Sequence, residues 1–177
     1  ISLLSWWSLV QFQPGAPTLS RILRTRGGLP MVDHELLESL SFFSELTDTE
    51  FLAVRPLCNE IHGQAGDCII KEGEPVRNLY ILVSGQVAIL KRRADGKQLA
   101  LATVGKGEVL GELTFLKFTP AFATVEAKEP FTALAIDQSE LQRLLDSETC
   151  IGAKLYKKLA RITGRRLRTI TSQFIGP

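Results

Sequence analysis

The sequence predicts a mainly β domain, an eight-stranded antiparallel jelly-roll barrel across about residues 63–137 with N-terminal helices and a long C-terminal helix. Three observations predict it. Between Gly63 and Asp137 apolar residues alternate in short runs separated by glycine turns, which is typical of antiparallel barrels. Before and after this region apolar residues recur every three to four positions, the period of a helix. The 177 residues, 45% of them hydrophobic, are enough to bury one core.

The first 30 residues are predicted to add little to this fold. They precede the sole methionine, Met31, which stands directly before an acidic amphipathic stretch and suits a translation start. Their apolar run, ISLLSWWSLVQF, is too short to span a bilayer and lacks the flanks of a signal peptide. We therefore expect a disordered or non-native leader over residues 1–30 and the domain over residues 31–177. A transit peptide is the alternative, because the leader holds Arg and Ser but no acid.

Two helical segments are predicted between Asp33 and Ile61. Each has one apolar face, the first at Leu36, Leu37, Leu40 and Phe43 and the second at Phe51, Val54, Leu57 and Cys58. Thr47 is a suitable N-cap for the second helix, and Glu50, three residues on, is its capping-box partner.

The strands are predicted from period-two runs in the middle of the chain. These runs are DCIIKEG, NLYILVSG, QVAILKRR, QLALATVG, EVLGEL, FATVEA and FTALAID. Asp95-Gly96 lies between two alternating runs and is a strong hairpin signal.

C-terminal helices are predicted over residues 138–174, with Ser139 as the candidate N-cap of the first. The long second helix has two apolar stripes, one at Ile151, Leu155, Leu159 and Ile162 and one at Tyr156, Ala160, Thr163, Leu167, Ile170 and Phe174. A helix packed only on its own barrel needs one stripe. The second, near-heptad stripe therefore predicts a homodimer through this helix, with plain intramolecular packing as the alternative.

Charge is divided along the chain. Residues 33–153 hold all 19 acidic groups against 11 Lys and Arg, a net of −8, whereas residues 154–177 carry seven basic groups and no acid. We expect the basic segment to fold back partly on the acidic body. A solvated helix face is favoured over contact with nucleic acid or anionic lipid, so neither nucleic acid nor a membrane is the expected partner.

No feature of the sequence indicates an enzyme. The three cysteines are far apart and lack CxxC spacing, which favours a reducing, cytoplasmic location over a disulfide framework. His34 and His62 have no His or Cys at metal-ligand spacing, and no local triad is evident. We expect no catalytic residue, no metal and no cofactor.

In the order of their predicted elements, residues 36–172 resemble the cyclic nucleotide-binding domain, the effector fold of the catabolite activator family and of kinase regulatory subunits. Single glycine turns are weak evidence, but here an ordered set is flanked by helices in the family's places. The set is Gly66-Asp67, Ile69-Ile70, Glu72-Gly73, Leu79 to Gly85, Val87, Gly96, Gly107-Glu108 and Gly111-Glu112-Leu113.

The resemblance implies that residues 111–125 form the phosphate-binding cassette. The short helix after Gly111 would present amides to a cyclic phosphate, and Glu112 would hold the ribose 2′-hydroxyl. The ligand-binding residues expected from this match are Gly111, Glu112, Leu113, Thr114, Ala121, Phe122, Ala123 and Thr124. The expected ligand is a cyclic nucleotide, cAMP or cGMP.

The cassette departs from the family's pattern where the phosphate needs its cation. Ala121 stands at the place of the family's arginine, and Phe122 at the place of a small neighbour. A charged hydrogen bond to phosphate is worth about 1.5–3 kcal/mol, so its loss predicts binding weaker by roughly tenfold to a hundredfold. Glu112 is left as an uncompensated negative charge, and Lys117 is interpreted as a solvated loop lysine. Phe122 is interpreted as core rather than as a ring that stacks on a ligand.

Three functions are weighed. The sequence favours a stand-alone regulatory, ligand-sensing domain with weak or altered cyclic nucleotide binding. The alternative is an interaction module that keeps the fold, dimerises and binds nothing small. A transcriptional regulator is disfavoured because no helix-turn-helix follows the long helix before Pro177. The downstream protein partner is not indicated by the sequence.

Overall fold

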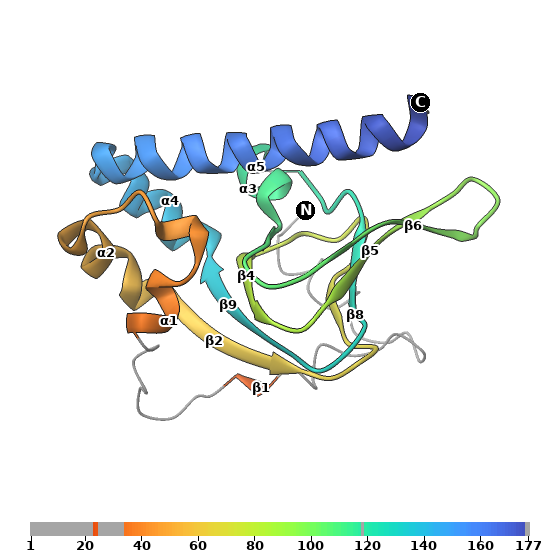
Figure 1. The fold of residues 1–177 in the computed structure, drawn as a ribbon, viewed down its shortest axis with the longest axis horizontal. Helices are drawn as coiled ribbons and strands as arrows, with labels where there is room; N and C mark the ends of the chain where they lie inside the picture. The colour runs from red at the N-terminus through yellow and green to blue at the C-terminus, as the bar shows by residue number, and fades with distance from the viewer. Residues whose placement is uncertain (1–22, 25–33, 118, 176–177) are drawn as a thin grey trace, which may run out of the picture.

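The computed structural model describes residues 23–24, 34–117 and 119–175. Helices gather at one end of the molecule and strands at the other, and one long helix runs along both (Figure 1). The N-terminal helical part consists of α1 (His34–Glu38), η2 (Ser41–Phe43), α2 (Asp48–Val54) and η3 (Arg55–Leu57). The predicted capping box of α2 is confirmed, because the Glu50 amide donates to the Thr47 hydroxyl and the Thr47 amide to the Glu50 carboxylate.

The strands form two antiparallel sheets. The first has the order β1-β2-β9-β4-β7 and comprises β1 (Leu23–Arg24), β2 (Cys58–Gly63), β9 (Phe131–Asp137), β4 (Asn78–Ser84) and β7 (Val109–Leu110). The second has the order β3-β8-β5-β6 and comprises β3 (Cys68–Ile70), β8 (Thr124–Ala127), β5 (Val87–Arg92) and β6 (Gln98–Val104).

The predicted mainly β architecture is confirmed, whereas closure into one barrel is not. The eight strands β2 to β9 lie within residues 58–137, but the described strands pair within two separate sheets rather than around one continuous ring. Two strands fall outside the predicted boundaries. β2 begins at Cys58, which was predicted to lie on the second helix, and β1 lies in the expected leader, where Leu23 and Arg24 pair with His62 and Ile61 at the edge of the first sheet. The rest of the leader, residues 1–22 and 25–30, lies outside the described residues.

Strand alternation creates two cores. In β4, Leu79 and Ile81 face the helices, where they join a cluster with Leu155 and Leu159. Tyr80 and Leu82 face the opposite way, into a second cluster between the two sheets. Both faces of β4 are therefore buried, which explains its unbroken apolar run.

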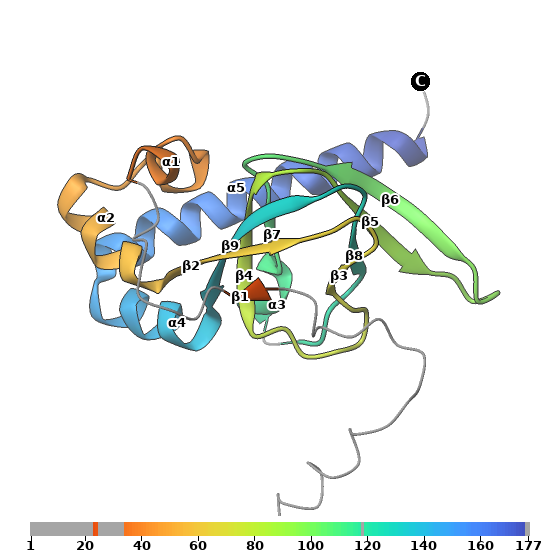
Figure 2. The same cartoon turned by 90° about the horizontal axis from the view of Figure 1, so that it is seen from below.

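The β5–β6 hairpin projects away from the rest of the fold (Figures 1 and 2). Its turn lies at the predicted Asp95-Gly96 step, where Gly96 has a φ of +81° and the Arg93 amide donates to Lys97 O at 2.8 Å. The positive φ favours glycine at this position.

Two helices follow the strands, α4 (Gln138–Ser147) and α5 (Thr149–Ile175). The N-cap of α4 is Asp137 rather than the expected Ser139, because the Asp137 carboxylate accepts from the Ser139 and Glu140 amides. The Asp137 carboxylate, two residues before Ser139, reaches these two amides, and the Ser139 hydroxyl donates to the same oxygen.

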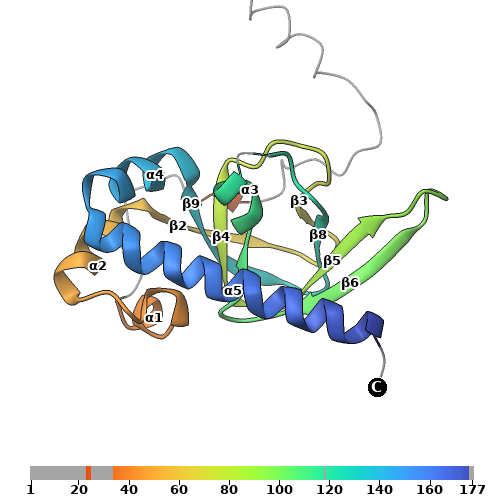
Figure 3. The same cartoon turned by 90° about the horizontal axis from the view of Figure 1, so that it is seen from above.

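The first stripe of α5 is buried as predicted, at Ile151, Leu155, Leu159 and Ile162. The residues of the second stripe differ in burial. Tyr156 stacks on Phe115 with ring centroids 6.1 Å apart, whereas Leu167 is 64% exposed. The cassette helix α3 lies beside the middle of α5, and the C-terminal half of α5 passes over β5 and β6 (Figure 3). The side chains of Ile170 and Phe174 lie outside the described part.

Among the described helices, none combines the length and the apolar character needed to cross a membrane. The three cysteines are free, and burial raises the pKa of the Cys58 thiol to about 12.

Candidate functional site

The site is organised around a sharp turn at Gly111, between β7 and the short helix α3 (Glu112–Lys117). Gly111 has a φ of +82°, and a Cβ there would lie 3.0 Å from Asn78 O. Glycine is therefore required both by the backbone angle and by the neighbouring strand. The Gly111 carbonyl accepts from the Phe115 amide at 3.1 Å and from Gln138 Nε2 at 3.4 Å, which fixes the turn against the start of α4.

The segment after α3 is held by the turn over residues 71–74. The Ala121 carbonyl accepts from the Gly73 amide, and the Ala121 amide donates to Glu74 O, each at 2.9 Å. The Thr124 hydroxyl accepts from the Glu72 amide at 3.1 Å. Ala121 is thus buried at a fixed backbone position. Its side chain, a single methyl group, lines the cavity that is described next.

A cavity of about 470 Å³ lies between the cassette, strands β5 and β6, and the C-terminal half of α5. Of the residues predicted to bind a ligand, seven line it: Gly111, Glu112, Leu113, Thr114, Ala121, Phe122 and Ala123. Thr124 is not among the lining residues, because its hydroxyl is bonded to the Glu72 amide. The cassette predicted from sequence therefore forms one wall of a real concavity.

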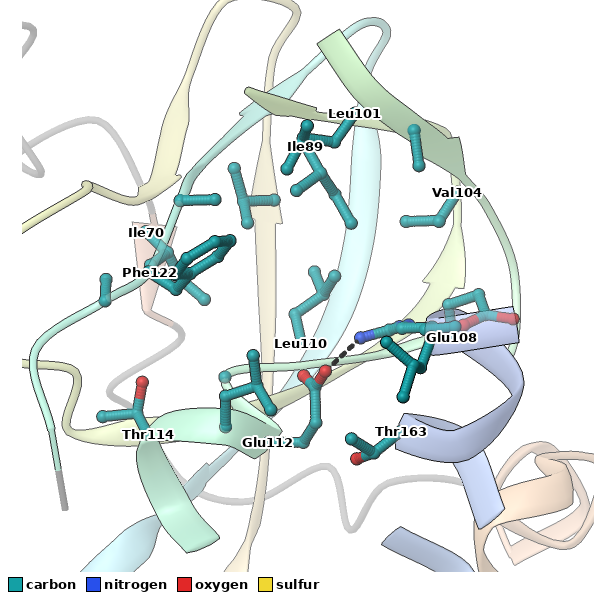
Figure 4. A pocket seen from close by; sticks show the side chains of 18 of the residues that line it. Ile70, Ile89, Leu101, Val104, Glu108, Leu110, Glu112, Thr114, Phe122 and Thr163 are labelled. Atoms are coloured by element: carbon teal, nitrogen blue, oxygen red, sulfur yellow. Dashed lines mark hydrogen bonds and ion pairs between the residues drawn. The ribbon is translucent and has the colours of Figure 1, made fainter. Parts of the chain in front are cut away.

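Phe122 is not the core residue that the sequence suggested. It is 59% exposed, and it lines the cavity on the side of Ile70 (Figure 4). Lys91 Nζ lies 4.2 Å from the centre of its ring and donates to the Phe122 carbonyl at 2.6 Å and to Glu72 Oε1 at 2.8 Å. The hydrogen bond from Lys91, with that from the Arg92 amide, lowers the pKa of Glu72. The ammonium nearest to Phe122 is therefore already partnered.

Arg166 of α5 lines the cavity and contacts Glu112, the acid of the cassette, directly. Its Nη1 donates to Glu112 Oε1 at 2.6 Å, and its Nη2 donates to Glu108 Oε2 at 2.8 Å and to the Val109 carbonyl. Arg165 adds a bond from Nη2 to Glu108 Oε1 at 3.1 Å. Two carboxylates and two guanidinium groups thus form one connected network.

This network overturns the expectation that Glu112 is uncompensated. The Glu112 side chain is only 7% exposed, and a buried carboxylate without a partner is costly. Burial opposes the charge of Arg166, but the carboxylates of Glu112 and Glu108 outweigh it and raise the pKa of the guanidinium above its usual value. The guanidinium of Arg166 therefore stays charged across the physiological pH range.

The basic C-terminal segment folds back on the acidic body, as its composition predicted. Besides the network above, Lys154 pairs with Glu50, and Arg161 pairs with Glu45. Lys117, by contrast, is exposed at the end of α3 and does not line the cavity, in agreement with its interpretation as a solvated lysine.

Sequence reasoning did not assign Arg166 to the site, although one signal was available. Arg166 lies four residues after Ile162 and seven after Leu159, so it continues the buried stripe of α5. A charged residue on a buried stripe requires a partner, and Glu112 was the acid without one.

Within the described part of the chain, no group of three or more His, Cys, Asp or Glu could hold a metal ion. What the site offers is a cavity with an apolar wall and a paired charge network at one end.

The sequence profile of the cyclic nucleotide-binding domain matches residues 60–148. A CRP-like cAMP-activated global transcriptional regulator of Mycobacterium tuberculosis is 25% identical over 134 residues, which are 76% of this chain and 58% of the regulator. A putative potassium channel protein of Rhodopseudomonas palustris is 28% identical over 138 residues, 77% of this chain and 33% of the channel. The chain thus spans about a third to three fifths of the length of these relatives.

Solved structures agree on the fold. A cyclic nucleotide-binding domain from Methylobacillus flagellatus superposes with a TM-score of 0.77 at 20% identity, covering 88% of this chain and 89% of that one. A regulatory subunit of a cAMP-independent protein kinase A from Trypanosoma brucei, in a triple mutant bound to cAMP, has a TM-score of 0.63 at 30% identity and covers 72% of this chain and 44% of that one. Profile, fold and cassette agree, and the chain belongs to the cyclic nucleotide-binding domain family.

Proposed function

We propose that this chain is a regulatory, ligand-sensing domain in which cAMP and cGMP bind weakly or not at all. The observation that carries the proposal is the pairing of Glu112 with Arg166, next to a cavity wall where Ala121 replaces a cation. Both features act on the same ligand, because a cyclic nucleotide needs a partner for its phosphate and a free acceptor for its ribose.

The phosphate side is weakened by the loss of a charge. Ala121 contributes a methyl group where an arginine would make charged hydrogen bonds of about 1.5–3 kcal/mol each. The Lys91 ammonium is bonded to Glu72 and to the Phe122 carbonyl, so recruiting it to a phosphate would break both contacts. In free solution the phosphate is hydrated by water. At Ala121 the protein offers no charged group whose contact with the phosphate would be stronger than this hydration.

The ribose side is weakened by competition. A ligand hydroxyl that donates to Glu112 must share the carboxylate with Arg166 or displace it. Because Arg166 belongs to α5, displacement would loosen the helix from the cassette, and ligand binding would be linked to the docking of α5. The strength of that link is set by the difference in ligand affinity between the docked and undocked states.

The Trypanosoma brucei regulatory subunit supports the reading of the missing arginine. It belongs to a cAMP-independent kinase, and its cAMP-bound form is a triple mutant in which one substitution introduces an arginine and two introduce alanine. A family member that does not respond to cAMP thus has a cAMP-bound variant that includes a new arginine.

Calorimetric titration with cAMP and cGMP tests the proposal. The double variant Ala121→Arg, Phe122→Ala should bind roughly 30-fold tighter than the wild type, a gain of about 2 kcal/mol. Ala100→Arg is the matched control, because Ala100 is exposed on β6 and does not line the cavity. Equal gains in the two variants would assign the effect to net charge, and no gain in the double variant would reject the account of the phosphate side.

A second candidate function is a dimerisation module without a small ligand. It is favoured by Leu167, which is 64% exposed on the part of α5 that passes over β5 and β6. We propose a parallel pair of α5 helices in which Leu167 and Ile170 meet their symmetry mates. Replacing both by glutamate should give a folded monomer in sedimentation velocity, whereas a wild type that is already monomeric at micromolar concentration would exclude this function.

A further inference from the structure

The cavity wall away from the charge network is apolar. It is built from side chains of the cassette, the two strands of the β5–β6 hairpin, β3, β7 and β8, and these side chains converge on the same space (Figure 4). The apolar lining residues include Ile70, Ile89, Leu101, Val104, Leu110 and Val125.

The charged groups that line the cavity are all paired within the protein. Glu112 and Glu108 accept from Arg166, and Arg165 also donates to Glu108. The charged side chains of the lining are therefore two carboxylates and two guanidinium groups, each in at least one ion pair, and Arg166 Nε is a buried atom of this set without a hydrogen-bond partner. An anion that entered would meet charged side chains that are already in ion pairs, so a full ionic partner would require breaking the pair between Arg166 and the buried Glu112.

An uncharged ligand meets neither cost. Its apolar surface would replace water against the aliphatic wall. Thr114 and Thr163 also line the cavity with neutral hydroxyls, and that of Thr163 can only accept from a ligand, because it already donates to the Leu159 carbonyl. The cavity volume of about 470 Å³ lies within the usual range for small-molecule sites.

We infer that the natural occupant of this cavity is an uncharged, predominantly apolar small molecule. The inference rests on the proposed function in that it takes the cassette cavity as the sensing site, and it names the chemical class that the cavity selects. The ligand class is a separate claim from weak nucleotide binding, because a cavity that binds nucleotides poorly need not bind an apolar molecule.

Two fluorescent probes with a common framework separate charge from apolar contact. N-phenyl-1-naphthylamine is neutral, and 8-anilino-1-naphthalenesulfonate adds one sulfonate to the same anilinonaphthalene body. We expect the neutral probe to bind the wild type with 1:1 stoichiometry and roughly tenfold or more tighter than the sulfonate. Sulfonate binding that is equal or tighter overturns the inference, as does the absence of saturable binding by the neutral probe.

Two leucines on β6 provide a matched pair of variants. Leu101 points into the cavity, whereas Leu99, two residues earlier, is exposed and does not line it (Figure 4). Leu101→Asp should weaken the neutral probe by roughly tenfold or more, and Leu99→Asp should leave it unchanged. Leu101→Trp, which fills the cavity without adding a charge, serves if Leu101→Asp fails to fold. Equal affinity of the neutral probe for the wild type and the folded Leu101 variant would place the probe elsewhere and reject the inference.

Ala121→Arg tests the charge argument in the opposite direction. It adds an unpaired cation to the wall, so the preference between the two probes should shift toward the sulfonate by roughly tenfold. An unchanged preference overturns the argument that pairing of the charges excludes anions. A cAMP titration of the same wild-type sample distinguishes failure of the proposed function from failure of the ligand class. Tight cAMP binding refutes the proposed function. Weak cAMP binding together with no binding of the neutral probe refutes the ligand class alone.

Discussion

Replacing Arg166 by glutamine removes the cation that joins α5 to the cassette. The guanidinium donates to Glu112, to Glu108 and to the Val109 carbonyl, and its side chain is 19% exposed. Glutamine keeps most of the aliphatic packing but leaves Glu112 buried without a cation. The free energy of unfolding should therefore fall mainly through the cost of an unpaired carboxylate.

The magnitude follows from the burial of the partners. Removing one member of a fully buried ion pair costs about 3–5 kcal/mol. The Glu112 side chain is 7% exposed, but Glu108 is 26% exposed and can recover hydration, so we expect a loss of about 2–3 kcal/mol. For a domain of this size that corresponds to a decrease in melting temperature of about 4–12 °C.

Arg161→Gln is the matched control, because it makes the same substitution five residues earlier on the same helix. Arg161 pairs with Glu45, but its side chain is 58% exposed, so its removal should cost about 0–1 kcal/mol. Both variants can be compared by urea unfolding monitored by circular dichroism. Adding Glu112→Gln to Arg166→Gln should recover part of the loss, because no buried charge remains. Equal destabilisation by Arg166→Gln and Arg161→Gln would refute the account of α5 docking.

Two further predictions concern the ends of the domain. A chain that begins at Met31 should melt within a few degrees of the full chain, because the described pairing of the leader is limited to the two residues of β1; a large decrease would make the leader part of the core. Asp137→Ala should lower stability by about 1 kcal/mol at neutral pH through loss of the α4 cap, as measured by urea unfolding. The Ser139 hydroxyl and the capped amides lower the pKa of Asp137, so its contribution is complete above about pH 4 and is lost as the pH falls through the lower folded value. A difference between wild type and variant that grows on acidification would contradict this sign.

Local patterns were enough to predict most elements of the fold. The short apolar runs of β4 and β5, the Asp95-Gly96 turn and the capping box at Thr47 each depend on residues close together in the chain, so the sequence predicts them directly. The division of the strands into two sheets depends on long-range register, and no local pattern specifies it. The cap of α4 was misplaced by two residues because Asp137 and Ser139 are both good N-caps.

The site residues that belong to the cassette were predicted from the sequence, whereas those that belong to α5 were not. Gly111 and Glu112 were identified from their turn and spacing, and both line the cavity. The pairing of Glu112 with Arg166 joins residues 54 positions apart, so it could be inferred only from the position of Arg166 on a buried stripe. Phe122 was misjudged because an aromatic residue beside a buried alanine is usually core, whereas here its ring lies against the Lys91 ammonium.

Calorimetric titration of the unmodified protein with cAMP tests the central claim most directly, since the missing cation and the occupied Glu112 both act on this ligand. The account predicts no detectable binding, or a dissociation constant well above the micromolar range, with α5 remaining docked through Arg166. Submicromolar binding would contradict it, and would mean that Arg166 or another residue of the long helix leaves its carboxylate partners to supply the phosphate's charge.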